Sequence, residues 1–142
     1  MVEKLKKWQS DYNKWLEDNP EANELEWRVS LRNQLFIKGL GYHESQVKYE
    51  RERTDLRIFG ENLIPYFVVE TKISDKSIDA KQTLSQALKY LDGGEQFVVL
   101  ASKKRIKIFD PFGIYLAEFD ILEPAISENP FFQIIHCDRL RD

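Results

Sequence analysis

The stretch that decides the fold is Tyr66-Phe67-Val68-Val69-Glu70-Thr71-Lys72. Its first residues, Tyr66 to Val69, are apolar on both alternating parities, which is typical of a central strand buried on both faces. A second run of this kind, Phe97-Val98-Val99-Leu100, follows a segment of helical periodicity at residues 79–91. A buried strand, a helix and another buried strand predict an α/β domain with a mixed β-sheet and helices on both faces.

The regions around these two strands extend the sheet. Leu56 and Ile58 alternate with polar residues, and the turn Gly60-Glu61-Asn62 separates them from the central strand, which predicts a β-hairpin. After the second buried strand, residues 106–109 and 114–119 are predicted to form two further strands. The weakly patterned tail has one candidate element, at residues 131–135.

Two amphipathic helices are predicted before the strands. The first, at residues 2–17, ends at Asn19-Pro20, because a residue before proline is disfavoured in the α region. The second, at residues 22–38, ends at the glycines that follow it. The apolar stripe of the first helix is Leu5, Trp8, Tyr12, Trp15 and Leu16, and that of the second is Leu25, Val29, Leu35 and Phe36. We expect both stripes to pack on the core, the alternative for the Trp8–Trp15 face being a docking surface for a partner.

The 142 residues predict a single domain. Its parts are an N-terminal amphipathic helix at 1–20, a core at 24–110, and a C-terminal strand and tail at 111–142. A composition of 42% hydrophobic and 32% charged residues is that of a globular chain and excludes a disordered one. The net charge of −3 excludes a basic nucleic-acid coat, so any DNA contact has to be local.

The sequence also predicts where the protein resides. The single Cys137 excludes an internal disulfide and fits a reducing compartment. The N-terminus mixes charges where a signal peptide would be apolar, and no apolar run is long enough to span a bilayer. We therefore expect a soluble, cytoplasmic protein with no membrane contact.

Most catalytic patterns are absent from the chain. It has no phosphate-binding GxxxxGK[ST] loop, no GxGxxG, no GxSxG and no HExxH. His43 and His136 lie far apart without the spacing of metal ligands. The candidates that remain are carboxylates.

Asp55, at the start of a strand, and Glu70, at the end of the central strand, are the carboxylates of interest. If the two strands pair as a hairpin, Asp55 lies beside Glu70, and Lys72 shares the face of Glu70 because residues two apart on a strand point the same way. Asp55, Glu70 and the backbone carbonyl of Thr71 then form a set of hard oxygen ligands suited to Mg²⁺. The alternative is a chance pattern in which Glu70 and Lys72 form a surface pair.

These residues resemble a known family, the PD-(D/E)XK nuclease superfamily, and within it the N-terminal nuclease domain of type I restriction enzyme R subunits. The resemblance covers residues 24–110. The matching elements are Glu24-Leu25-Glu26-Trp27-Arg28, Gly41-Tyr42, Arg53-Thr54-Asp55-Leu56, Val68-Val69-Glu70-Thr71-Lys72 and Gln86-Ala87-Leu88-Lys89-Tyr90. It implies a restriction-endonuclease-like fold in which Asp55 and Glu70 bind Mg²⁺ or Mn²⁺ and Lys72 is the catalytic lysine.

The resemblance also implies roles for residues on the helices. Either Glu24 or Glu26 is the metal-side carboxylate. Counting back from Tyr42 favours Glu26, and Glu24, four residues before Arg28, can instead pair with that arginine. Gln86 and Tyr90, four apart on one helix, are implied to lie by the active site. Taken without the family, these two residues would be read as an ordinary solvated face.

One departure from the family concerns the segment after the second buried strand. The family often has Thr-Asn-Gly there, whereas this chain has Ala101-Ser102-Lys103-Lys104-Arg105. The basic residues Lys103, Lys104 and Arg105 are candidates for contacting DNA phosphates, or else they form a solvated turn.

The resulting hypothesis is a Mg²⁺-dependent DNA endonuclease domain. Helicase, methyltransferase and specificity subunits of a restriction system are candidate partners, and the chain is either an excised domain or a stand-alone relative. The alternative is a catalytically inactive module of the same fold that binds nucleic acid or a partner protein.

Overall fold

The computed structural model describes residues 5–50, 55–60 and 63–137. The helices are α1 (Lys7–Asp18), α2 (Glu24–Leu31), the π-helix η1 (Arg32–Gly39), η2 (Glu44–Gln46), η3 (Asp75–Asp79), α3 (Lys81–Leu88), η4 (Ile126–Glu128) and α4 (Pro130–Ile134). The strands are β1 (Val47–Tyr49), β2 (Leu56–Phe59), β3 (Pro65–Thr71), β4 (Phe97–Ala101), β5 (Arg105–Phe109) and β6 (Tyr115–Asp120).

The strands form one six-stranded sheet in the order β1-β2-β3-β4-β5-β6. The pair β3–β4 is parallel, and every other neighbouring pair is antiparallel. The predicted mixed sheet and the β2–β3 hairpin are thus confirmed, although Glu61 and Asn62 of the predicted turn lie outside the described residues. The central position of β3 explains its run of buried residues from Tyr66 to Thr71.

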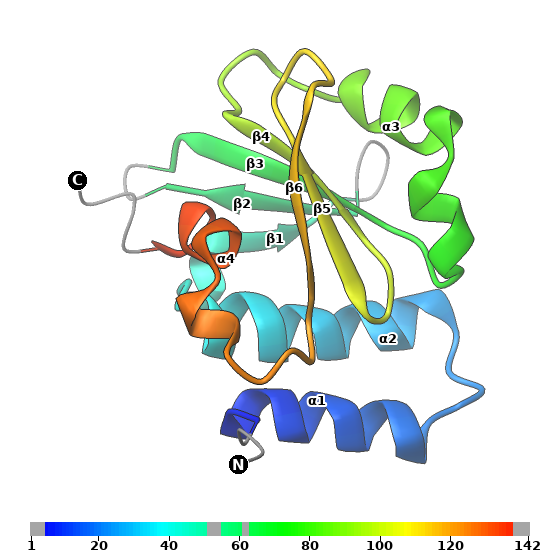
Figure 1. Ribbon diagram of the computed structural model, residues 1–142. Coiled ribbons are helices and arrows are strands. Elements are labelled where there is room, and N and C mark those ends of the chain that lie inside the picture. The colour runs from blue at the N-terminus through cyan, green and yellow to red at the C-terminus, as the bar shows by residue number, and fades with distance from the viewer. Residues whose placement is uncertain (1–4, 51–54, 61–62, 138–142) are drawn as a thin grey trace.

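Helices cover both faces of the sheet, as the sequence predicted (Figure 1). One face carries α1, α2, η1 and α4 and encloses the larger core, to which Phe67 and Val69 contribute. The other face carries α3 over a smaller core that includes Val68 and Leu100. Alternate residues of β3 therefore point into different layers. In the described part of the chain, no helix has the length and apolar character needed to cross a membrane.

The aromatic stripe of α1 belongs to the core, as expected. Trp8 and Tyr12 are buried, and Trp15 packs against the same cluster. The Tyr12 hydroxyl accepts a hydrogen bond from the Trp27 indole at 2.9 Å and donates one to the Lys103 carbonyl at 2.6 Å. These bonds attach α1 to α2 and to the β4–β5 turn, so most of the Trp8–Trp15 face is covered by the protein itself, as predicted, and is not left for a partner.

The apolar face predicted for the second helix is confirmed for Leu35 and Phe36, which are buried in the core, and was wrong for Leu25 and Val29. Leu25 is 67% exposed and Val29 is 45% exposed, whereas Trp27 and Leu31 are fully buried. The large Trp27 ring fixes which side of α2 faces the sheet, and Leu25 and Val29 lie on the opposite side. The helix continues through η1 with a wider π-helical turn that the 3.6-residue period does not anticipate.

Two other element boundaries differ from the prediction. Residues 79–91 do not form one helix: η3 ends at Asp79, and α3 ends at Leu88. Strand β1 was not predicted, because its segment is rich in charge and has only one buried residue, Val47. Because β1 lies at the edge of the sheet, its other side chains are exposed, and the segment therefore shows no apolar alternation in the sequence.

Candidate active site

The register of the β2–β3 hairpin brings two of the candidate carboxylates together. Leu56 pairs with Val69, so Asp55, which directly precedes β2, lies next to Glu70 near the end of β3. The negative charge of Asp55 acts on the Glu70 carboxyl, which places the two groups within electrostatic range of each other. The hairpin register therefore brings Asp55 and Glu70 to the same end of the sheet, and a metal ion shared by their carboxylates stays a prediction.

Lys72 shares the face of Glu70. Its Nζ lies 3.5 Å from Glu70 Oε1, and its side chain is 32% exposed. Glu70 itself is only 4% exposed, and its second oxygen, Oε2, is buried without a hydrogen-bond partner among the described residues. Burying a carboxylate oxygen without a hydrogen bond lowers the stability of the fold. The same oxygen is available to bind a further ligand.

The environment of Glu70 favours its protonated form. Burial, followed by the negative charge of Asp55, raises the pKa of Glu70 to about 7. Lys72 opposes this rise, and Glu24 adds to it. Glu24, Asp55, Glu70 and Lys72 therefore form one electrostatic group at this end of the sheet.

Asp55 is held by the end of β3. Its Oδ2 accepts hydrogen bonds from the Thr71 amide at 2.6 Å and from the Thr71 hydroxyl at 2.7 Å. Its Oδ1 lies 3.0 Å from Nη2 of Arg28 on α2. The Arg28 Nε also donates to the Thr71 hydroxyl at 3.0 Å. The Thr71 residue thus orients Asp55 through both its backbone and its side chain.

Of the two candidate helix carboxylates, Glu24 is the one that lies beside these groups. Its Oε1 lies 3.2 Å from Arg28 Nη2 and accepts a hydrogen bond from the Thr71 hydroxyl at 3.2 Å. Glu26 instead belongs to a capping box: its amide donates to the Asn23 side chain at 2.9 Å, and its carboxylate accepts from the Asn23 amide. Glu26 is exposed at the start of α2 and does not face the site.

The donor set has the chemistry of a magnesium site but not a preformed cage. Within residues 5–50, 55–60 and 63–137, no group of three or more His, Cys, Asp or Glu side chains is arranged to hold a metal ion. The observation that fits a cation is Oε2 of Glu70, which is buried without a hydrogen-bond partner among the described residues and belongs to a carboxyl within electrostatic range of Asp55. Oxygen ligands of this kind suit Mg²⁺, which keeps several waters and needs only one or two protein carboxylates.

Gln86 and Tyr90 do not share a helix face, because α3 ends at Leu88 and Tyr90 follows it. Gln86 is exposed and makes no hydrogen bond to Lys72 among the described contacts. The Tyr90 backbone carbonyl accepts a hydrogen bond from Arg57 Nη2 at 3.1 Å. Their catalytic roles stay a prediction that rests on the family resemblance, and the prediction that they share one helix face was wrong.

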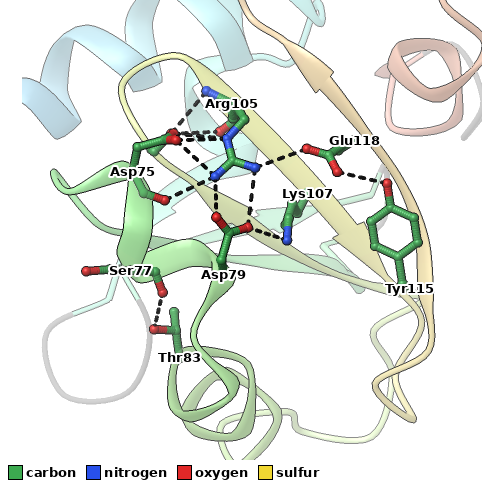
Figure 2. Close-up of polar contacts among 9 residues, drawn as sticks. Asp75, Ser77, Asp79, Thr83, Arg105, Lys107, Tyr115 and Glu118 are labelled. Atoms are coloured by element: carbon green, nitrogen blue, oxygen red, sulfur yellow. Dashed lines mark hydrogen bonds and ion pairs between the residues drawn. The ribbon is translucent and has the colours of Figure 1, made fainter.

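Arg105, predicted to contact DNA, is occupied by acidic side chains (Figure 2). Its guanidinium bonds to Asp79 at 2.7 Å, to Asp75 at 3.0 Å and to Glu118 at 3.1 Å. These bonds raise the pKa of Arg105 above its ordinary value and lower the pKa of Asp79 to about 2. Arg105 therefore joins η3 to β5 and β6, and its charge is not available to a phosphate.

Lys103 and Lys104 differ from Arg105 in this respect. Neither ammonium group forms an ion pair within the described part of the chain, and Lys104 is exposed. Both line a hollow of about 480 Å³, together with Ile73, Asp75, Arg105 and Asp120. Since β3 and β4 are parallel, the hollow lies at the same edge of the sheet as Lys72.

Two arginines of this region were not predicted as site residues. Arg28 contacts Asp55, Glu24 and Thr71, and the sequence signals for it were its spacing of four residues from Glu24 and its place in the helix element of the family resemblance. Arg57, which is 2% exposed, is bound to Glu50 and Glu95 and fixes the chain after α3 through Tyr90. An arginine within a strand of alternating residues gave no sign that it would be buried.

Comparison with known proteins supports the fold. The structure aligns with a chain in the cryo-EM structure of a DrdV–DNA complex at a TM-score of 0.62 and 12% sequence identity. The alignment covers 92% of this chain and 13% of that one, so this chain spans about an eighth of the other protein's length. No family model and no curated protein matches the sequence significantly. The mixed sheet with helices on both faces is compatible with a restriction-endonuclease-like fold.

Proposed function

We propose that this domain is a Mg²⁺-dependent DNA endonuclease, with Asp55 and Glu70 as metal ligands and Lys72 as the catalytic lysine. The observation that carries the proposal is the meeting of these three residues at the end of β3, where one oxygen of Glu70 is buried without a partner among the described residues. The Thr71 carbonyl, between Glu70 and Lys72 in the chain, is a further candidate ligand. Mn²⁺ is an alternative metal of the same ligand preference.

Each side chain has a definite task in such a reaction. Asp55 is oriented by Thr71, which binds its Oδ2 and leaves its Oδ1 as the oxygen that would bind the metal. Glu70 is desolvated, which strengthens its attraction for a cation. Lys72, half-exposed next to Glu70, can stabilise negative charge developing on a phosphate or orient the attacking water. A bound Mg²⁺ would supply Lewis-acid polarisation of the phosphate and acidify water.

DNA is the proposed substrate because the aligned solved structure is a complex with DNA. Lys103 and Lys104, at the same sheet edge as Lys72, offer unpaired positive charge for phosphates next to the scissile one. Arg105 is excluded from this role by its carboxylate partners. With so few basic contacts and a net charge of −3, the isolated domain should bind DNA weakly. Within a restriction system, a helicase, methyltransferase or specificity subunit would supply the remaining affinity.

The second candidate function is a non-cutting module of the same fold that binds nucleic acid or a partner protein. The observation in its favour is Arg28, whose guanidinium already pairs with both Asp55 and Glu24. Carboxylates that share a cationic partner in this way repel each other less and are held in place without a metal ion.

A cleavage assay separates these two functions. Supercoiled plasmid is incubated with the domain and either Mg²⁺ or Mn²⁺, beside Lys72→Ala and the control Lys38→Ala, an exposed lysine at the end of η1. We expect nicking or cutting that falls at least about 100-fold in Lys72→Ala and is unchanged in Lys38→Ala. Equal cleavage by the wild type and Lys72→Ala would indicate a contaminant. No cleavage with either metal, and with DNA binding retained, would favour the non-cutting module.

A further inference from the structure

Arg28 is the group whose position the proposed cleavage reaction does not explain. From α2, its Nη2 reaches Asp55 Oδ1 at 3.0 Å and Glu24 Oε1 at 3.2 Å, while its Nε bonds to the Thr71 hydroxyl at 3.0 Å. Its side chain is only 12% exposed. A guanidinium keeps its charge at every accessible pH, so a permanent, poorly screened cation lies on two carboxylates of the candidate metal site.

The hydrogen bonds of Asp55 show that Arg28 is not needed to orient it. Asp55 Oδ2 already accepts from both the amide and the hydroxyl of Thr71. These two bonds fix the plane and direction of the carboxylate without any contribution from α2. What Arg28 adds at Oδ1 is chiefly positive charge, on the oxygen that would otherwise be open to a metal ion.

We infer that Arg28 is a built-in counter-ion that competes with the divalent cation for Asp55 and so keeps the metal affinity of the site low. The inference rests on the metal site of the proposed function. It adds to that proposal that the guanidinium has to leave Asp55 when the cation binds, which lowers the metal affinity of the site.

Arg28 has a second carboxylate partner that it can keep when it leaves Asp55. Glu24 is one helical turn before it on α2, and its side chain is 37% exposed, so the pair can persist after Arg28 leaves Asp55. The Glu70 carboxylate, with its partnerless Oε2, is not contacted by Arg28 among the described interactions. A cation could thus reach Glu70 first and compete for Asp55 from there.

The test is the affinity of the DNA-free domain for Mn²⁺, measured by the electron paramagnetic resonance signal of the free ion. The wild type is compared with Arg28→Met and Arg28→Gln, which remove the charge and, in the second variant, keep a hydrogen-bond donor. Arg32→Met is the matched control, because Arg32 is one turn further along and bonds mainly to the carbonyls of Val47 and Glu44. Circular dichroism checks that each variant is folded.

We expect both neutral variants to bind Mn²⁺ at least about tenfold more tightly than the wild type, with Arg32→Met unchanged. Glu70→Gln added to Arg28→Met should abolish the gain, which ties it to this site. Unchanged or weaker affinity in folded Arg28→Met and Arg28→Gln would overturn the inference while leaving the metal site of the wild type intact. If neither the wild type nor any variant binds Mn²⁺ through Glu70, the metal site fails, and the inference fails with it. If only Arg28→Gln folds, that variant decides.

Discussion

Glu70 is a carboxylate whose burial opposes its ionisation. Its side chain is enclosed at the end of β3, beside Asp55, and both effects raise its pKa to about 7. Lys72 compensates for only part of this cost. Without a cation at Oε2, the folded domain therefore holds a proton on Glu70 more tightly than the unfolded chain does.

This environment predicts a pH dependence of stability with a definite sign. Because the folded pKa lies above the ordinary value of 4.5, the contribution of Glu70 to stability is complete below that value and is lost as the pH rises through about 7. Urea unfolding of the metal-free domain should give a free energy lower at pH 8 than at pH 5 by on the order of 2–3 kcal/mol from this group. Glu70→Gln should remove this part of the slope.

The control for this measurement is Glu21→Gln, an exposed carboxylate before α2. It should leave the slope unchanged. At pH 8, Mg²⁺ should stabilise the wild type and not Glu70→Gln, because the cation replaces the missing partner of Oε2. The same slope in the wild type and Glu70→Gln would show that Glu70 does not titrate in this range.

At the scale of elements, the acidic residues of η3 are joined to β5 and β6 through Arg105 (Figure 2). This ion-pair network holds the connection between Lys72 and α3 against the sheet. Its carboxylates are 39–57% exposed, so each pair is weak by itself and screened by salt. The network as a whole should still order η3, because one guanidinium serves several acids.

Arg105→Met should lower the melting temperature by a few degrees, more at low salt than at high salt. It should also speed amide hydrogen exchange in η3, because Asp75 and Asp79 would repel each other. Lys104→Met is the control, since Lys104 is exposed and makes no ion pair in the described chain. Equal melting temperatures for the two variants at low salt would mean that the network contributes nothing.

The accuracy of the sequence prediction followed the strength of each local pattern. Tyr66 and Phe97 begin apolar runs with no polar interruption, so β3, β4 and their central place were predictable. The face of α2 was not, because the hydrophobic period cannot tell that Trp27, and not Leu25, points inward. Strand β1 escaped notice because only Val47 is buried.

The candidate site was likewise predictable from the sequence only in part. The positions of Asp55, Glu70 and Lys72 follow from strand pairing and parity, which a sequence contains. The partners of long charged side chains do not follow from it. Arg105 was named as a candidate for DNA because its acidic partners come from η3 and β6. The pairing of Arg28 with Glu24 could be predicted, but its contact with Asp55 could not, because that contact joins α2 to the residue before β2.

At the scale of the whole molecule, the sheet brings the proposed catalytic residues to the same edge as Lys103 and Lys104, two lysines that form no ion pair in the described part of the chain. Strands β3 and β4 run in parallel, so Glu70 and Lys72 at the end of one lie beside Lys103 and Lys104 after the other. α2 adds Glu24 and Arg28 to the same end. The fold thus gives a DNA backbone one edge on which positive charge and metal-binding oxygens lie together.

The most direct test of the central claim is a crystal structure of the domain soaked with Mn²⁺, located by its anomalous scattering. The account predicts one strong peak at the end of β3, bonded to Glu70 and Asp55 at about 2.2 Å, with the Arg28 guanidinium withdrawn from Asp55. A peak confined to other acids, such as Asp75 and Asp79, or no peak at saturating Mn²⁺, would contradict it.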